Sequence, residues 1–182
     1  MLVLGEADRL VEYAEKHYES FDFHKPATRI RHFIWESFAS HYLELVKGRA
    51  YNQERRYSRE EQNAAIWTLN EVLEKMLRAL YPIIPFITHK ICSDIYGENI
   101  EELAFPKPDG KPPGKKPAFG FSDIEKVNSG IWKAKKDSGA SLKSEVSEAT
   151  IPDKLKPIKD DIKTTHNIKK LVFGKRFSVK LG

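Results

Sequence analysis

Residues 32–49, HFIWESFASHYLELVKGR, decide the fold because they predict a long helix with a wide apolar face. The apolar residues recur at steps of four, four and three: Ile34, Phe38, Tyr42 and Leu45. This spacing lines one side of a helix. Trp35 widens the stripe, so we expect Trp35 and Phe38 to be buried against a neighbouring helix. Such a face is covered most readily by other helices, which predicts a mainly α fold.

Three further helices are expected around this central one, over residues 7–21, 59–81 and 83–96, with the central helix itself running from about 22 to 47. Gly48 can close the central helix. Ser58 and Glu61 have the spacing of a capping box, which predicts a helix start. Pro82 ends that helix, and Gly97 ends the next one. Residues 1–97 therefore read as a helical bundle.

The chain changes character after the bundle. Five of the ten prolines lie between residues 106 and 117, so residues 98–121 predict a strap and linker without regular structure. Residues 122–182 predict a small basic α+β module. It begins with a helix over 123–138, followed by a strand over 145–151 and a short helix after Pro152. Alternating apolar residues on both sides of Gly174 and Lys175 favour a β-hairpin at the C-terminus.

The charge of the 182 residues is unevenly distributed. Residues 1–100 carry 13 basic and 15 acidic side chains, whereas residues 101–182 carry 18 and 11. A basic C-terminal half indicates a polyanionic partner or a solvated lysine-rich surface. The lone Cys92 allows no internal disulfide and fits a reducing compartment. No apolar run has the length of a membrane span and no signal peptide opens the chain, so we expect a cytoplasmic protein without membrane contact.

The connection after the central helix is the best candidate for a nucleic-acid contact. It carries five cations and two tyrosines within thirteen positions: Lys47, Arg49, Tyr51, Arg55, Arg56, Tyr57 and Arg59. Cations can bind phosphates and tyrosine rings can stack on unpaired bases. The alternative is an ordinary exposed loop. Three lysines of the C-terminal module could touch the body of the same RNA: Lys133, Lys135 and Lys136.

Motifs for catalysis are missing from the sequence. There is no glycine-rich phosphate loop, no paired CxxC, no HExxH and no GxSxG. His89 and Cys92 are three residues apart, but two ligands do not make a metal site. We therefore expect neither a catalytic residue nor a metal site in this chain.

Three stretches resemble the anticodon-binding region of class I aminoacyl-tRNA synthetases of the valyl type. The first contains Trp35, Phe38, the run Tyr42-Leu43-Glu44-Leu45-Val46-Lys47 and Arg49. The second contains Leu77 and the run Leu80-Tyr81-Pro82-Ile83-Ile84-Pro85-Phe86-Ile87-Thr88. The third is weaker and contains Trp132-Lys133, Lys135-Lys136, Gly139 and Ser141-Leu142. His89-Lys90 and Cys92 depart from the glutamates and the tryptophan that the family usually has there.

This resemblance implies a helical bundle that binds the anticodon stem-loop of a tRNA, tRNA(Val) in the valyl type. Its other partners would be the remaining domains of the synthetase. The family's HxGH and KMSKS signatures for ATP are absent, so ATP would bind to a catalytic domain outside this chain, and no cofactor is expected here. The competing interpretation is a free-standing protein-interaction scaffold, which a large exposed apolar patch would favour.

Overall fold

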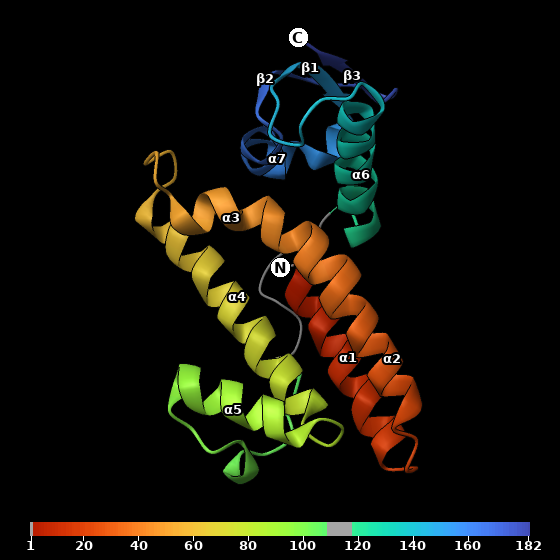
Figure 1. Cartoon of the computed structure of the whole chain (residues 1–182), viewed down its shortest axis with the longest axis vertical. Coiled ribbons are helices and arrows are strands. Elements are labelled where there is room, and N and C mark those ends of the chain that lie inside the picture. Colours follow the sequence, from red (N-terminus) through yellow and green to blue (C-terminus); the bar gives the residue numbers. More distant parts are fainter. Residues whose placement is uncertain (1, 109–117) are drawn as a thin grey trace. The chain divides into compact units, whose positions relative to one another are not determined.

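A computed structural model describes residues 2–108 and 118–182 of the chain. It confirms the mainly α fold with a small sheet near the C-terminus (Figure 1). Two compact units are present: unit 1 is Met1–Phe38 with Ile66–Lys115, and unit 2 is Ala39–Ala65 with Lys116–Gly182. This division differs from the sequence-based boundaries, because residues 39–65 group with the C-terminal part. Within the strap and linker predicted over 98–121, residues 109–117 lie outside the described residues.

Unit 1 is built from helices only, apart from its loops. Its elements are α1 (Leu2–Tyr18), α2 (His24–His32), most of α4 (Arg59–Leu80), α5 (Pro85–Tyr96) and the short 3-10 helix η2 (Ile100–Glu102). α1 and α2 pack against each other (Figure 1). Leu77 of α4, Cys92 of α5 and Ile100 of η2 form one buried cluster. The strap predicted after α5 packs on unit 1. Leu103 contacts this cluster, and the ring of Phe105 meets that of Tyr18 edge to face.

The central helix is not one regular α-helix. It consists of α2, the π-helix η1 (Phe33–Leu43) and α3 (Glu44–Tyr51). A π-helix bonds residue i to i+5 and holds more residues in each turn, so side chains four apart no longer stay in line. The prediction that Trp35 is buried is therefore wrong, since 71% of it is exposed. Phe33 is buried instead, and Phe38 stacks on it with ring centroids 6.1 Å apart.

The ends of α4 and α5 agree with the sequence signals. Ser58 Oγ accepts from the backbone N–H of Glu61 at 3.2 Å, and Glu61 Oε2 accepts from the N–H of Ser58 at 2.8 Å. This is the predicted capping box. α4 ends at Leu80, before Pro82. Gly97 follows α5 in the left-handed conformation, with φ of 69°.

Unit 2 combines α3 with the helix α6 (Phe121–Asp137) and a three-stranded sheet. The strands are β1 (Val146–Ile151), β2 (Ile168–Phe173) and β3 (Ser178–Leu181), and the 3-10 helix η3 (Asp153–Ile158) and helix α7 (Lys159–His166) connect β1 to β2. The strand order is β2-β1-β3, with β1 parallel to β2 and antiparallel to β3.

The predicted C-terminal hairpin is therefore wrong, although both of its strands exist. β2 and β3 lie on opposite sides of β1 and do not pair with each other. Alternation of apolar residues indicates a strand but says nothing about its neighbour. β1 is the strand with the most buried residues, with Val146, Ala149 and Ile151 inaccessible, so it takes the centre of the sheet.

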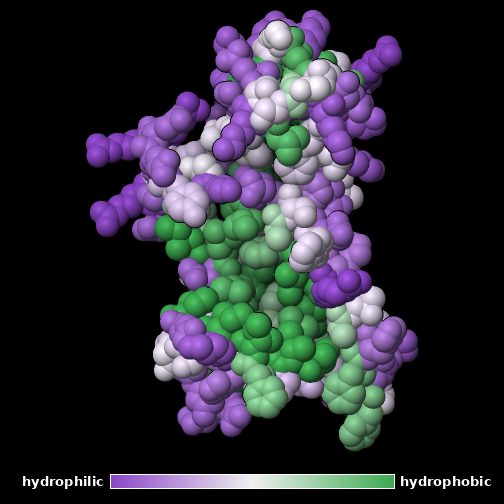
Figure 2. Space-filling model, in the orientation of Figure 1, coloured by the Kyte–Doolittle hydropathy of each residue, from purple (hydrophilic) through white to green (hydrophobic). Residues whose placement is uncertain are grey.

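Unit 1 exposes a broad apolar surface. Figure 2 shows hydrophobic side chains gathered over α4 and α5. The most exposed in this part are Phe86 at 90%, Ile87 at 57% and Ile95 at 52%. Folded proteins rarely leave such side chains grouped in water without a partner. Within the described ranges, no helix has the length and apolar content needed to cross a membrane.

Candidate nucleic-acid interface

The loop between α3 and α4 is closed by one asparagine. Asn52 ends α3 in the left-handed conformation, with φ of 46°. Its side-chain Nδ2 donates to the carbonyl of Tyr57 at 2.8 Å, and its Oδ1 accepts from the N–H of Tyr57 at 3.1 Å. The donor and the acceptor of the Asn52 side chain therefore hold the two ends of the loop together. The residues between them, 53–56, are exposed and carry Arg55 and Arg56.

α3 and α7 meet closely beside this loop. Thr165 Oγ1 donates to the carbonyls of Glu44 and Leu45 at 3.2 and 3.1 Å. A Cβ placed on Gly48 would lie 2.6 Å from Cγ2 of Thr164. The helix runs past Gly48 to Tyr51, so the expectation that Gly48 closes it is wrong. Gly48 instead lets α7 approach α3 in a way that a larger residue would prevent.

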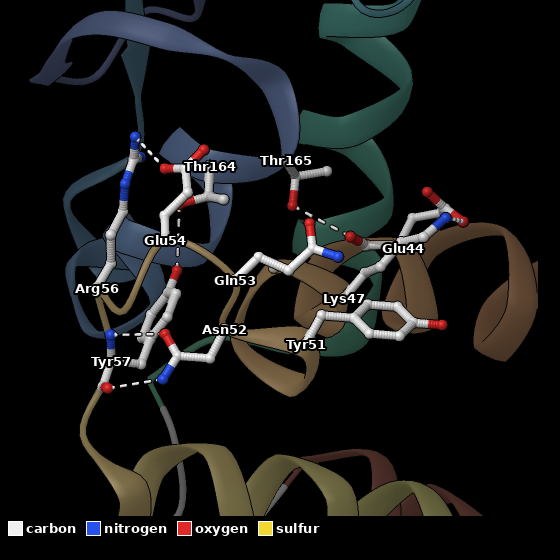
Figure 3. Close-up of a pocket in the computed structure, with 11 residues that line it drawn as sticks. Glu44, Lys47, Tyr51, Asn52, Gln53, Glu54, Arg56, Tyr57, Thr164 and Thr165 are labelled. Carbon is white, nitrogen blue, oxygen red and sulfur yellow. Dashed lines mark hydrogen bonds and ion pairs between the residues drawn. The ribbon is translucent and has the colours of Figure 1, made fainter.

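A cavity of 520 Å³ opens where α3, the loop and α7 meet (Figure 3). Its size is in the range of pockets that hold small ligands. It is lined by Glu44, Lys47, Gly48, Tyr51, Asn52, Gln53, Glu54, Arg56, Tyr57, Thr164 and Thr165. Four of the residues predicted to bind RNA therefore line this cavity: Lys47, Tyr51, Arg56 and Tyr57. Tyr57 forms part of its wall, with its hydroxyl 3.2 Å from Thr164 Oγ1.

Two of the predicted cations are held by contacts within unit 2. Arg49 Nη2 lies 3.1 Å from Oδ2 of Asp161, whose side chain is only 6% exposed. Burial raises the pKa of Asp161 to about 6, and this effect outweighs the nearby Arg49, which lowers it. Lys135 is fully buried, and its Nζ donates to the carbonyls of Leu142 and His166 at 2.8 and 2.9 Å. The predicted contact of Lys135 with RNA is inconsistent with this position, because its ammonium is buried and hydrogen-bonded within unit 2.

The remaining predicted cations lie at the surface in two groups. Lys47, Arg56 and Lys133 pair with the exposed acids Glu44, Glu54 and Asp137. Exposed pairs of this kind contribute little free energy and exchange easily for another partner. Arg55, Arg59 and Lys136 have no acidic partner within the part of the chain that the structure describes. Their charges are therefore the ones most available to an anion.

The network around Lys135 is aromatic and largely buried. His166 Nε2 lies 2.9 Å from Asn128 Oδ1, and burial followed by the charge of Lys135 lowers the pKa of His166 to about 3. Trp132 contacts His166 at 5.4 Å between ring centroids and stacks on His41 at the same distance. These rings hold α6 against α7 and the end of η1. The neutral imidazole of His166 is thus a structural group.

Sequence reasoning missed four residues of this site: Asn52, Gln53, Thr164 and Thr165. Asn52 could have been found, because Asn tolerates the left-handed conformation and often closes turns. The threonines lie more than 100 positions along the chain, and no local signal links α7 to α3. Among the described residues, no group of three or more His, Cys, Asp and Glu side chains could hold a metal ion.

Comparisons with known proteins agree with this architecture. The family model described as "Anticodon-binding domain of tRNA ligase" matches residues 2–151. The chain is similar to a valine–tRNA ligase of Aeropyrum pernix, with 36% identity over 166 residues, covering 90% of this chain and 20% of the relative. A valine–tRNA ligase of Pyrobaculum aerophilum is 42% identical over 138 residues, covering 74% and 17%.

The matched region is a small part of each relative, because the chain spans about a fifth of the length of these curated proteins. A third relative, the valine–tRNA ligase of Nanoarchaeum equitans, shows the same proportion, with 32% identity over 91% of this chain and 21% of the relative. The match of the family model covers unit 1 and the part of unit 2 that ends with β1 at Ile151. The chain therefore belongs to the family of anticodon-binding domains of tRNA ligases.

Proposed function

We propose that this chain binds the anticodon arm of a tRNA as part of a valine–tRNA ligase. The observation that carries the proposal is the loop closed by Asn52. The loop carries Arg55, which has no acidic partner among the described residues, and it follows Tyr51, which is 67% exposed. An unpaired cation binds a phosphate without losing an ion pair, and an exposed ring can stack on a base. Arg59, at the start of α4, extends the cationic surface.

The proposed role is binding and positioning, without bond-making steps in this chain. Valine activation and its ATP would belong to a catalytic domain outside the chain, and the tRNA would be tRNA(Val), as the names of the relatives suggest. With ATP and valine, the chain alone should give no pyrophosphate exchange above a control without protein. The buried free thiol of Cys92 supports a cytoplasmic location as part of this proposal.

A second function is favoured by the apolar surface of unit 1. Phe86, Ile87 and Ile95, all on α5, are more than half exposed, and such grouped side chains mark protein-binding surfaces. This observation fits a protein-interaction scaffold, the alternative to RNA binding. It also fits RNA binding by unit 2, if unit 1 contacts the remaining domains of the same synthetase. We favour this combined arrangement because the two surfaces differ in chemistry.

The RNA proposal is tested by filter binding across a salt series. The ligands are a valine-type anticodon stem-loop and an unrelated hairpin of equal length. With about four to six phosphate contacts, the log–log slope of affinity against salt should be roughly −3 to −5. The valine-type arm should bind more tightly, because charge alone cannot discriminate between sequences. Equal affinity for both RNAs would contradict anticodon binding and leave the scaffold as the better explanation.

A further inference from the structure

The cavity in unit 2 has balanced charges, which limits what it can bind. Lys47 pairs with Glu44 at 3.2 Å, and Arg56 pairs with Glu54. All four of these side chains line the cavity. A phosphate entering it would meet two carboxylates together with the two cations. A neutral planar group with polar edges therefore fits this space better than a phosphate does.

Two lining side chains are left free to hold such a group. The ring of Tyr51 is exposed, and Gln53 projects into the cavity with no hydrogen-bond partner among the described residues (Figure 3). The neighbouring amide of Asn52 is already used at both ends by Tyr57. Gln53 is thus the lining amide that can offer both a donor and an acceptor to a ligand.

We propose that the cavity binds one unpaired nucleobase, with Tyr51 stacked on its face and Gln53 hydrogen-bonded to its edge. The inference rests on the proposed function and names the part of the RNA that this site takes. Adenine fits best, because a glutamine amide can bond to its N6 and N7 at the same time. Stacking holds any base, so Tyr51 supplies affinity and Gln53 supplies the preference.

The chain of the RNA has a path out of this cavity. A second cavity of 770 Å³ shares Glu54, Arg56, Tyr57 and Thr164 with the first. Lys163 lines it and has no acidic partner in the described ranges. The nucleotide next to the bound base can therefore lie across Tyr57, with its phosphate near Lys163 in the second cavity.

The test is fluorescence anisotropy with the valine-type anticodon stem-loop and four variants of the chain. Tyr51→Ala should weaken binding by about 5- to 150-fold, whereas Tyr51→Phe should bind as wild type because the ring remains. Gln53→Ala should weaken binding by at least about fivefold. Asn63→Ala is the matched control, since Asn63 is an exposed amide of unit 2 that lines neither cavity. The salt slope should stay unchanged in every variant.

Modified RNA then tests the contact between Gln53 and the base. Each adenine of the loop is replaced in turn by 7-deazaadenine, which keeps the ring but lacks the N7 acceptor. One replacement should weaken binding to the wild type and have no further effect on Gln53→Ala, because the two changes remove the same bond. Additive effects at every position, or a loss with Tyr51→Ala alone, would overturn the assignment of Gln53.

The two levels of the proposal fail in different ways. If the wild type prefers the valine-type arm and binds it with a steep salt dependence, but Tyr51→Ala and Gln53→Ala bind equally well, the base-binding cavity is wrong and anticodon-arm binding stands. If the wild type shows no preference between this arm and the unrelated hairpin, the proposed function itself is wrong.

Discussion

The two units expose different chemistry at their surfaces. Nine of the thirteen large hydrophobic side chains that are exposed in the described ranges belong to unit 1. Unit 2 exposes the loop with Arg55 and Arg56, the ring of Tyr51 and a cavity to which charged, amide and hydroxyl side chains contribute. Burying an apolar surface against another apolar surface is favourable, because it removes both from water. Cations and amides without a partner can instead bind the phosphates and bases of RNA. The contrast supports the proposed arrangement, in which unit 1 binds protein and unit 2 binds RNA.

The buried charges of the two units resemble each other, in contrast to their surfaces. Unit 1 buries Lys75 against Asp8, and unit 2 buries Asp161 against Arg49. Unit 2 also holds Lys135 against two carbonyls. A buried charge is costly when its partner is removed, so each of these groups stays with its partner and cannot turn to a ligand. Burial separates structural cations from cations available for binding.

The largest expected effect is on the interior of unit 1. Lys75→Met would leave Asp8 buried without its cation, which should lower the free energy of unfolding by about 3–5 kcal/mol. The matched control is Lys90→Met, because Lys90 pairs with Asp94 at the surface and is 74% exposed. That change should cost no more than about 1 kcal/mol. Urea unfolding of both variants measures this difference. Equal decreases in the free energy of unfolding would show that burial of the Lys75–Asp8 pair does not matter.

The next effect concerns acid and unit 2. The pKa of His166 is lowered from 6.5 to about 3, so the unfolded state takes up a proton below pH 6.5 that the folded state refuses. His166 therefore lowers the free energy of unfolding by about 2 kcal/mol as the pH falls from 7 to 5. Asp161 acts in the opposite direction, because its raised pKa favours the folded state as the pH falls, by about 1 kcal/mol over the same range.

His166→Gln isolates the histidine, since glutamine keeps a side-chain donor towards Asn128 and does not titrate. Unfolding by urea at pH 7 and pH 5 should show that the variant escapes the loss of about 2 kcal/mol that His166 causes. Wild type and variant would respond equally to acid if His166 were accessible to protons in the folded state.

A smaller effect is expected from the free cations of unit 2. Arg55→Ala/Arg59→Ala should flatten the salt slope of RNA binding by roughly one to two units, because it removes phosphate contacts. Its unfolding free energy should stay within about 0.5 kcal/mol of wild type, since both side chains are exposed. Arg49→Ala is the informative contrast, because it should destabilise the protein by leaving Asp161 buried without its cation. An unchanged slope in the double variant would remove these arginines from the interface.

Local signals in the sequence were sufficient for most helix ends. The capping box of Ser58 and Glu61, the stop at Pro82 and the left-handed Gly97 each depend on a few neighbouring residues. Pairing between distant segments was not predictable in the same way. The hairpin failed because β1, more than twenty residues before β2 and β3, lies between them.

The candidate site shows the same limit. The sequence brought Lys47, Tyr51 and Arg56 together, because they lie within ten positions. It placed Arg49 and Lys135 in the same class as these residues, although both are used inside unit 2. Their partners are Asp161 on α7 and carbonyls at Leu142 and His166, so the distinction depends on tertiary packing. Charge in a sequence therefore indicates that a polyanion can bind, but burial decides which cations contact it.

The smallest expected effect on stability is at the surface of unit 1. The exposure of Trp35 shows that a large aromatic residue in this unit does not have to be core, and Phe86 is exposed further, at 90%. Phe86→Ala should change the unfolding free energy by less than about 0.5 kcal/mol. The control is Leu77→Ala, since Leu77 is 5% exposed in the core and its truncation should cost about 2–5 kcal/mol. Phe86→Ala should also leave RNA affinity unchanged, because α5 belongs to unit 1. If Phe86→Ala destabilised the chain as much as Leu77→Ala, this apolar surface would be part of the core, and the contrast between the two units would not hold.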